Sequence, residues 1–277
     1  MNDSAAVPDY NLMHAKWAAS YVPIRESKVL VVGCNTGLDV KNLVDLGARE
    51  AWGVDVVDEI GRDFTHPAAH YLRTSVEAMD LPDDSFDLVF SFATMEHVPD
   101  IVRGFAEMAR VTRPGGWIYS VAAPLWRSPY GHHKPDLFLG HPWVHLLHTR
   151  DEILALCERE GIRPADGTGI AHHVDYMLDP AFFNMTPAAT YLEACRALPK
   201  MEVLRNDFDS LPDSELSAEL EATLAAKGYP RAELLAVTHV FVAQKRDPKR
   251  ALSGFAWKLL QRARAFLAKV RIRLLGR

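Results

Sequence analysis

The sequence predicts an α/β fold in which a mostly parallel sheet is covered by helices on both faces. Three observations indicate this fold. Short β-branched runs alternate with segments of helical periodicity in the first half of the chain, the first run ends in glycine, and a further strand pattern returns at residues 237–244. Strands that alternate with helices of about ten residues form right-handed βαβ units, and the strands of such units are parallel.

The first half of the chain contains five expected strands, separated by helical segments. The strands are expected at residues 29–32, 51–57, 70–74, 87–92 and 117–123. Gly47 closes a helical segment over 42–46, and a second segment over 102–111 has apolar residues at helical spacing. The second segment stops at Arg113-Pro114-Gly115-Gly116, because proline and glycine both interrupt helices.

The second half is less regular and is expected to surround one edge of the sheet. Residues 124–149 are rich in histidine, proline and aromatic residues and predict a long functional loop. A helix is expected over 150–160, with Thr149 as its N-cap and Gly161 at its end. Residues 180–228 have a mostly helical pattern and are expected to form a helical cap insertion.

Charge is distributed unevenly along the 277 residues, whose formal net charge is −5. Residues 245–277 hold eleven Lys and Arg and one acid, Asp247, whereas the other 244 residues hold 20 basic and 35 acidic side chains. We therefore expect one domain over residues 1–246 and a basic tail over 247–277. The acidic body argues against nucleic acid as a partner, because it would repel phosphates.

The composition bounds the class of protein. The 48% hydrophobic and 24% charged residues are globular proportions, which exclude a disordered, collagen-like or coiled-coil chain. The three cysteines, at positions 34, 157 and 195, are widely spaced, which indicates a reducing compartment. With no secretory signal in residues 1–28 and no apolar run of 18 residues, a cytoplasmic location is expected.

The sharpest motif is the glycine turn after the first strand, Val29-Leu30-Val31-Val32-Gly33-Cys34-Asn35-Thr36-Gly37. A buried strand that ends in such a turn is expected to place free backbone N–H groups at the ligand-binding edge of the sheet. Asp55, 22 residues after Gly33, is placed to accept hydrogen bonds from ribose hydroxyls. The dinucleotide pattern and the P-loop pattern both fail, so a nucleoside without a phosphate chain fits better. The alternative is a pair of glycines that only turn the chain.

Five segments, in order, resemble the motifs of class I S-adenosylmethionine-dependent methyltransferases. They are Val29–Gly37, Trp52–Asp55, Glu77–Pro82, Ser85–Val89 and Arg113–Gly116. The resemblance covers roughly residues 28–123 and implies a Rossmann-like sheet of seven strands, in which the last strand, 237–244, is inserted antiparallel. Two positions depart from the family pattern. Val31 replaces an acid, and Asn35 replaces a glycine, although asparagine tolerates a left-handed backbone.

The resemblance also implies S-adenosylmethionine as the cofactor. The cofactor-binding residues that it implies are Gly33, Cys34, Asn35, Gly37, Asp55, Glu77, Ala78 and Phe92. The glycine turn is expected to line the methionine part, and Asp55 to hold the ribose. Glu77 and the backbone of Ala78 are expected to meet the adenine, and Phe92 to lie near the sulfonium.

Five of the twelve histidines lie in the loop after the fifth strand, at positions 132, 133, 141, 145 and 148. Imidazole has a pKa near neutrality, which suits removal of a proton from a methyl acceptor. His132 or His133 is the expected general base, with His145 and Asp136 as orienting or substrate-binding groups. His97 is a further catalytic candidate, which would position the acceptor.

Tyr130 and Trp143 are expected to bind the acceptor. Tyr130 begins the segment that holds His132, His133 and Asp136, and Trp143 belongs to an aromatic surface of the type that stacks on sugar rings. For each histidine the alternative is a structural hydrogen bond. A zinc site of His141, His145 and His148 is another alternative, but Pro142 restricts the helix that it needs, so no metal is expected.

The basic tail has a helical apolar stripe from residue 252 to 274, with lysine and arginine on its flanks and back. Such a helix is typical of an anchor in the interface of an anionic membrane, so residues 251–277 are expected to bring the protein to the inner face of the membrane. The alternative is packing on the chain's own domain or on a second subunit.

The sequence thus predicts a cytoplasmic methyltransferase that uses S-adenosylmethionine to methylate a hydroxyl group. A sugar on a lipid-linked or surface glycan is the expected acceptor. One alternative is methylation of a lipid, a quinone or a secondary metabolite. Another is a non-catalytic module that binds S-adenosylmethionine, which Val31 and Asn35 leave open.

Overall fold

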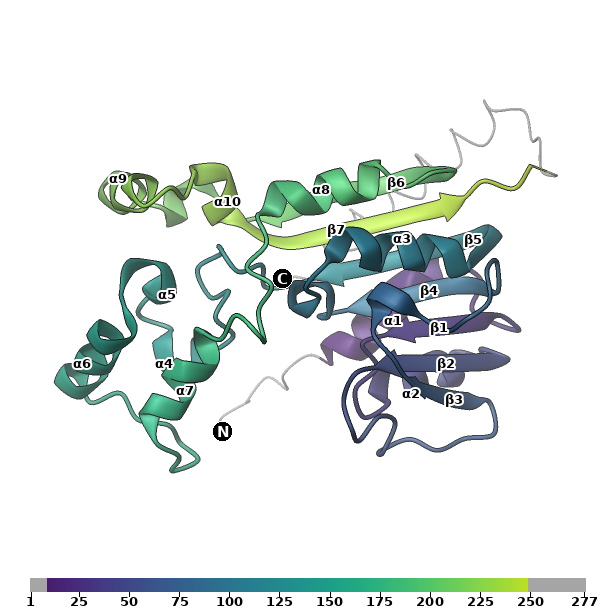
Figure 1. The fold of residues 1–277 in the computed structure, drawn as a ribbon, viewed down its shortest axis with the longest axis horizontal. Coiled ribbons are helices and arrows are strands. Elements are labelled where there is room, and N and C mark those ends of the chain that lie inside the picture. Colours follow the sequence, from purple (N-terminus) through teal and green to yellow (C-terminus); the bar gives the residue numbers. More distant parts are fainter. Residues whose placement is uncertain (1–8, 249–277) are drawn as a thin grey trace, which may run out of the picture.

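The structure, a computed structural model, describes residues 9–248 and is built on one sheet flanked by helices (Figure 1). The strands are β1 (Lys28–Val32), β2 (Glu50–Asp55), β3 (Ala69–Arg73), β4 (Phe86–Phe92), β5 (Thr112–Ala122), β6 (Met201–Ser210) and β7 (Ala236–Lys245). Their order is β3-β2-β1-β4-β5-β7-β6, with β1 to β5 parallel and β7 antiparallel to both of its neighbours. The predicted fold class is confirmed, including the late antiparallel strand.

Helices cover both faces of the sheet, which explains why β1 is apolar from Val29 to Val32. The covering helices are α1 (Tyr10–Tyr21), α2 (Leu38–Asp45), α3 (Ile101–Val111) and α8 (Ala188–Arg196). Val29 and Val31 belong to the apolar core under α1 and α2, whereas Leu30 and Val32 belong to the core under α3 and α8. Successive side chains of a strand point to opposite faces, so a strand buried on both sides needs no polar alternation.

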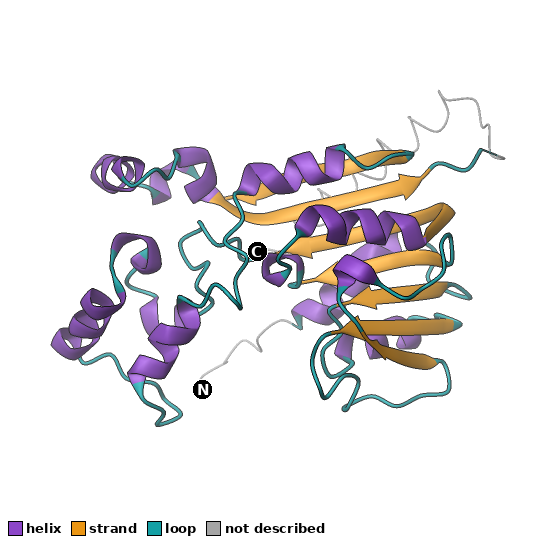
Figure 2. Cartoon of the chain, viewed as in Figure 1, coloured by secondary structure: helices purple, strands orange, loops and turns teal. Residues whose placement is uncertain are grey.

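A helical lobe, residues 123–187 and 211–235, lies beyond the carboxyl end of β5, on the left of the view (Figure 2). Its helices are α4 (Pro135–Phe138), α5 (Val144–Leu147), α6 (Arg150–Glu160), α7 (Ile170–Met177), η3 (Asp213–Glu215), α9 (Ala218–Ala226) and α10 (Arg231–Leu235). Two apolar clusters stabilise it, one that includes Phe183 and Leu224 and one that includes Phe138 and Met177. The predicted loop and the predicted cap therefore fold together.

Three features correct the sequence-based expectations. Residues 201–210, expected within the helical insertion, form β6, an edge strand whose polar residues gave no strand signal. Helix α1 was not expected, because its apolar residues do not gather on one face. The segment Arg113–Gly116 lies inside β5 as an irregularity, where the pairing with β4 shifts register between Phe86 and Leu88.

Helix α6 begins and ends where the sequence predicts. Thr149 and Glu152 form a reciprocal capping box at its start, and Gly161 ends it with φ +68°. The predicted tail, with its amphipathic helix, lies outside the described residues. Within residues 9–248 no helix is long and apolar enough to cross a membrane.

Candidate active site

The glycine turn joins β1 to α2 at the edge where the parallel strands end. Gly33 and Gly37 have φ of +74° and +108°, and Asn35 between them has φ +43°. A Cβ atom at Gly33 would overlap the side chain of Thr94, and one at Gly37 would lie 2.6 Å from Tyr71 Oη. Both positions therefore require glycine, and Asn35 adopts the left-handed backbone expected of it.

Contrary to the expectation of free N–H groups, three successive N–H groups of the turn are bonded within the chain. Those of Gly33 and Cys34 donate to the carbonyl of Val54, and that of Asn35 donates to Asp55 Oδ2 at 2.8 Å. The site thus lets a ligand come close to the backbone at the glycines and offers it the carboxylate of Asp55, but it does not offer a row of N–H donors. This donor set fits a nucleoside with ribose hydroxyls and does not fit a phosphate chain.

Cys34 turns its side chain toward β2. A Cβ atom on Gly53 would lie 2.6 Å from the Cys34 sulfur, so the thiol fills the space that this glycine leaves. Burial raises the pKa of the thiol to about 12. Any cofactor contact of Cys34 is therefore left to its backbone.

Glu77 lies in η1 (Val76–Ala78), at the position predicted for adenine. Its Oε1 accepts a hydrogen bond from the N–H of Asp100 at 2.8 Å, and its Oε2 accepts one from Ser75 Oγ at 2.9 Å. Glu77 thus holds η1 against the start of α3. The adenine contacts of Glu77 and Ala78 stay predictions.

Helix α1 covers this edge and brings a residue that sequence reasoning missed, His14. The His14 ring stacks on Phe92, with ring centroids 4.1 Å apart, and its Nδ1 lies 2.9 Å from Tyr119 Oη. Burial lowers the pKa of His14 to about 4, so the ring is neutral near pH 7. One turn earlier, Asn11 donates to Asp39 of α2 at 3.1 Å. Together these contacts fix α1 over the end of β4 and beside the glycine turn.

A cluster of three chemically active side chains follows β4. Glu96 and His97 lie in η2 (Met95–His97), and His133 reaches them from the loop after β5. One carboxylate oxygen and one nitrogen of each ring lie within 4.8 Å of one another. Burial raises the pKa of Glu96 to about 8, opposed by the nearby backbone N–H groups of Glu96 and Ala123, and lowers the pKa of His133 to about 4. The sequence pointed to both histidines, but not to Glu96.

A family described as a methyltransferase domain matches residues 30–120, which run from β1 to near the end of β5. The match includes the glycine turn, Asp55 and the pair Glu96–His97. Residues 30–120 of the chain are thus similar to a methyltransferase domain. The cofactor predicted from the sequence, S-adenosylmethionine, is the one that this class of domain uses.

Curated relatives of the methyltransferase domain share about a third of the aligned residues. An uncharacterized methyltransferase of Mycobacteroides abscessus is 32% identical over 171 residues, 54% of this chain and 65% of that protein. A ubiquinone biosynthesis O-methyltransferase of Albidiferax ferrireducens is 31% identical over 127 residues, 43% of this chain and 49% of that protein. The chain thus spans about half to two thirds of the length of these relatives.

Solved structures share the fold at low identity. An S-adenosylmethionine-dependent methyltransferase of Mesorhizobium loti superposes with a TM-score of 0.50 at 16% identity, over 83% of this chain and 97% of that one. The [4+2]-cyclase SpnF superposes with a TM-score of 0.52 at 16% identity, over 89% of this chain and 85% of that one. Since a cyclase shares the fold, the fold alone does not decide the reaction.

Beyond the methyltransferase domain, two predicted catalytic histidines are buried in the helical lobe. His132 is 0% exposed and its Nδ1 accepts a hydrogen bond from the N–H of Lys134, while His145 Nε2 donates to the carbonyl of Trp126 at 2.7 Å. Burial lowers the pKa of His132 to about 3 and that of His145 to about 4. These contacts favour structural roles, and the catalytic role of both residues stays a prediction.

The residues predicted to bind the acceptor lie apart from one another. Trp143 is 1% exposed, with its Nε1 donating to the carbonyl of Arg127, so burial removes the open face that stacking on a sugar needs. Tyr130 is half-buried and its Oη donates to the carbonyl of Leu139 at 2.7 Å. Asp136 is exposed in the first turn of α4.

The three histidines weighed as a zinc site point to different partners. His141 Nε2 lies 2.8 Å from a carboxylate oxygen of Glu160, and His148 Nδ1 lies 4.0 Å from Glu152. His145 is bonded to the lobe backbone instead. Among the described residues these three do not form a metal-binding group.

Proposed function

We propose that this chain is an S-adenosylmethionine-dependent methyltransferase that methylates a hydroxyl group. The observation that carries the proposal is the meeting of the glycine turn and the cluster Glu96–His97–His133 at one sheet edge. Thr94 links the two, since its side chain fills the space beside Gly33 and it precedes Glu96 by two residues. An acceptor at the cluster would therefore lie beside a cofactor at the turn.

The chain's own task in such a reaction is to align the acceptor and to take up its proton. S-adenosylmethionine, when bound, supplies an electrophilic methyl group on a sulfonium. Burial lowers the pKa of His97 and of His133, so both rings are neutral near pH 7 and each keeps a nitrogen that can accept a proton. Helix α1 and the helical lobe flank this edge, which favours exclusion of water from it.

The acceptor that the site supports best is a hydroxylated aromatic ring. Phe182, 37% exposed, lies with its ring centroid 4.5 Å from that of His97 and 4.6 Å from that of Tyr176. Such a half-open aromatic edge suits a planar acceptor. The name of the ubiquinone biosynthesis relative points to the same chemistry. A sugar hydroxyl is the second candidate, although Trp143, which favoured it, is buried.

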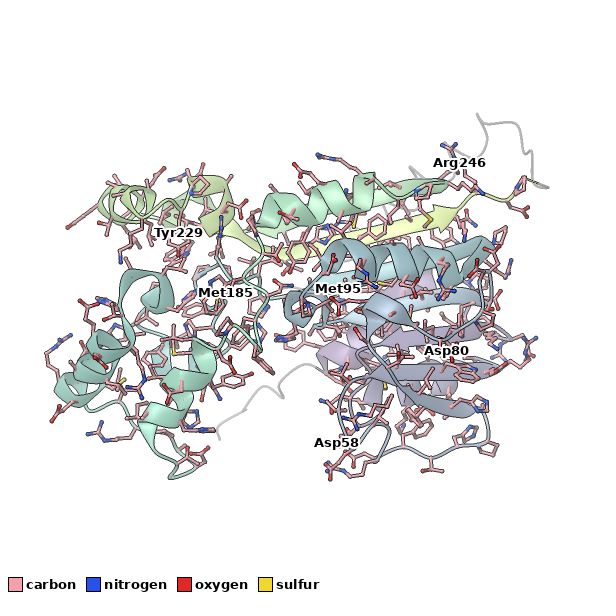
Figure 3. The ribbon with its side chains drawn as sticks, in the orientation of Figure 1. Asp58, Asp80, Met95, Met185, Tyr229 and Arg246 are labelled. Carbon is pink, nitrogen blue, oxygen red and sulfur yellow. The ribbon has the colours of Figure 1, made fainter. Side chains whose placement is uncertain are left out.

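A matched pair of variants tests the cofactor half of the proposal. Asp55→Ala removes the predicted ribose ligand, whereas Asp58→Ala, labelled in Figure 3, removes a carboxylate of the next loop that pairs with Arg73 at the surface. By calorimetry we expect S-adenosylmethionine to bind at least about tenfold more weakly to the first variant and unchanged to the second. Equal affinities of both variants for S-adenosylmethionine would contradict the assignment of the cofactor site to the glycine turn and Asp55.

Formation of S-adenosylhomocysteine with a panel of acceptors tests the reaction itself. Catechols and hydroquinones are expected to react faster than sugars or sugar phosphates. Faster turnover of sugars would instead support a sugar hydroxyl as the acceptor. Tight binding of S-adenosylmethionine without turnover of any acceptor would indicate a non-catalytic binding module and contradict the proposed reaction.

We further propose that residues 251–277 attach the protein to an anionic membrane surface. The support is their sequence, in which apolar residues at helical spacing alternate with lysine and arginine. The full chain is expected to sediment with anionic vesicles and not with neutral ones, and a chain that ends at residue 248 with neither. Equal sedimentation of the two chains would refute the attachment.

A further inference from the structure

The carboxyl group of Glu96 is buried without a well-formed hydrogen bond, and a role in proton removal does not explain this. Its side chain is 3% exposed, and in the described part of the chain neither carboxylate oxygen has a partner of good hydrogen-bond geometry, although the backbone N–H groups of Glu96 and Ala123 lie near them. A buried polar atom without a partner costs free energy, and a buried charge costs more unless a counter-charge compensates it. A cation bound beside Glu96 would give these oxygens a partner and stabilise the ionised carboxylate.

The two histidines beside Glu96 each present one unprotonated nitrogen. His97 Nδ1 lies 3.0 Å from the carbonyl oxygen of Phe182, and His133 Nε2 lies 3.3 Å from that of Pro124. A carbonyl oxygen only accepts hydrogen bonds, so these two nitrogens carry the ring protons. Nε2 of His97 and Nδ1 of His133 are thus left as lone-pair donors. Metal-binding histidines in proteins are held in this way, with the second ring nitrogen bonded to a carbonyl or a carboxylate.

We propose that Glu96, His97 and His133 bind a divalent transition-metal ion, of the chemistry of Zn²⁺ or Fe²⁺. Two imidazole nitrogens and one carboxylate oxygen are a ligand set that these ions take in sites with open positions. The nitrogen ligands disfavour Mg²⁺ and Ca²⁺, which prefer oxygen. The site differs from the histidine triad considered from the sequence, none of whose members belongs to it.

The spacing of the donor atoms suits one ion. Bonds from zinc to nitrogen or oxygen are about 2.0–2.2 Å long, so two ligand atoms of one ion lie at most about 4.4 Å apart. One carboxylate oxygen of Glu96 and one ring nitrogen of each histidine lie within 4.8 Å of one another. Small side-chain rotations would therefore close the site without a change in the backbone.

The role of the ion rests on the proposed function, whereas its binding does not. Three protein ligands leave coordination positions for an acceptor hydroxyl. An ion there would hold the acceptor oxygen and favour release of its proton to solvent, which makes the oxygen a better nucleophile. His97 and His133 would then act as ligands instead of as the base.

Metal titration of the full chain tests the site without any turnover. Protein purified without a histidine tag is treated with chelator and dialysed, and then titrated with Zn²⁺ by calorimetry and with Co²⁺ by visible absorption. We expect one equivalent to bind and Co²⁺ to show the d–d bands of a nitrogen- and oxygen-ligated ion. Glu96→Gln and His133→Ala should each weaken binding by at least about tenfold, since even the loss of a supporting group costs that much. His148→Ala, which removes an exposed histidine outside the cluster, should leave binding unchanged.

The controls separate a failed site from a failed fold or a failed function. Circular dichroism must show that each variant is folded, and Glu96→Gln keeps the shape of the side chain. Asp55→Ala should lose S-adenosylmethionine and keep the metal, so the two sites fail independently. Absence of stoichiometric Zn²⁺ and Co²⁺ binding to the folded wild type would overturn the proposal. Unchanged binding in both Glu96→Gln and His133→Ala would overturn it as well.

Discussion

The Nδ1–H group of His97 donates a hydrogen bond to the backbone carbonyl of Phe182, with 3.0 Å between nitrogen and oxygen. This bond connects the end of β4 to the helical lobe. Asn184 reinforces the junction, because its Nδ2 donates to the carbonyls of Met95 and Val98 at 2.8 and 2.9 Å. Figure 3 shows Met95 at the end of the sheet that faces the lobe. The position of the lobe and the position of the cluster are therefore coupled.

Asn184→Ala tests this coupling. The substitution removes the Asn184 donor from the carbonyl of Val98, and leaves the carbonyl of Met95 with only the longer bond from Tyr191 Oη at 3.3 Å and that from the N–H of Val98. The free energy of unfolding should therefore fall by about 1–3 kcal/mol in chemical denaturation. It should also raise the KM of the acceptor more than the Kd of S-adenosylmethionine, since the lobe moves relative to η2. Asn206→Ala is the matched control, because Asn206 donates to the carbonyl of Leu192 in a different part of the fold. If both variants change only stability, the lobe does not position the acceptor.

Gly33→Ala is expected to disrupt the cofactor edge through a clash as well as through the backbone. A residue with φ near +70° costs about 1–2 kcal/mol when it is not glycine. Gly161→Ala isolates that cost, because Gly161 has φ +68° and nothing within 4 Å of an added Cβ. At Gly33 the added Cβ also overlaps Thr94, so the loss of stability by denaturation should exceed that of Gly161→Ala. The double variant Gly33→Ala with Thr94→Gly should recover the difference, and equal losses in the two single variants would refute the clash.

The sequence sufficed where local pattern decides the structure. Strand β1 is apolar from Val29 to Val32, and strand β4 is apolar apart from Asp87 and Ser91. Thr149 and Gly161 bound their helix by backbone chemistry, and the glycine turn has φ values that few other residues adopt. Where contacts distant in sequence decide the structure, the sequence was insufficient. Strand β6 exists because β7 pairs with it, although Arg205 and other charged residues mask its pattern.

The residues of the candidate site also divide into those that the sequence predicts and those that only the fold brings together. Asp55 follows a strand at a fixed spacing from the turn, so its position was predictable. His14 meets Phe92 only through the packing of α1, which carries no one-sided apolar stripe. Glu96 belongs to the site because His133 lies beside it in the fold. His133 is 37 residues further along the chain and was expected to act with other histidines, so the sequence did not connect the two.

The buried ring of His14 predicts a loss of stability in acid. Burial lowers its pKa from an ordinary 6.5 to about 4, so the unfolded chain binds a proton at His14 that the folded chain does not bind between these values. The contribution of the neutral ring is present above pH 6.5 and is lost as the pH falls toward 4. His14→Phe removes the titration and keeps a ring against Phe92. The free energy of unfolding of the wild type, relative to this variant, should fall by up to about 1.4 kcal/mol per pH unit in that window.

Tyr119→Phe is the control for the His14 experiment. It removes the hydroxyl that lies 2.9 Å from His14 Nδ1 and leaves the buried ring in place. Its difference from the wild type should therefore vary little with pH, whereas that of His14→Phe should vary steadily. Denaturation at four values between pH 7.5 and 4.5 measures both, and parallel pH profiles for the wild type and His14→Phe would show that the ring is not the source of the dependence.

The four histidines predicted to be catalytic are expected to separate into two classes. His97→Ala and His133→Ala remove members of the cluster, and their kcat should fall by about 10²–10⁴-fold, the range of a lost acid–base or activating group. Their affinity for S-adenosylmethionine should stay near that of the wild type, because the predicted cofactor ligands, the glycine turn and Asp55, follow β1 and end β2. His132→Ala and His145→Ala should lower the free energy of unfolding, since both rings are buried in contacts of the lobe, while the folded fraction keeps most of its kcat. Single-turnover formation of S-adenosylhomocysteine, normalised to folded protein by circular dichroism, measures both classes. A large loss of kcat in folded His132→Ala with full activity in His97→Ala would return the chemistry to the loop histidines that the sequence first indicated.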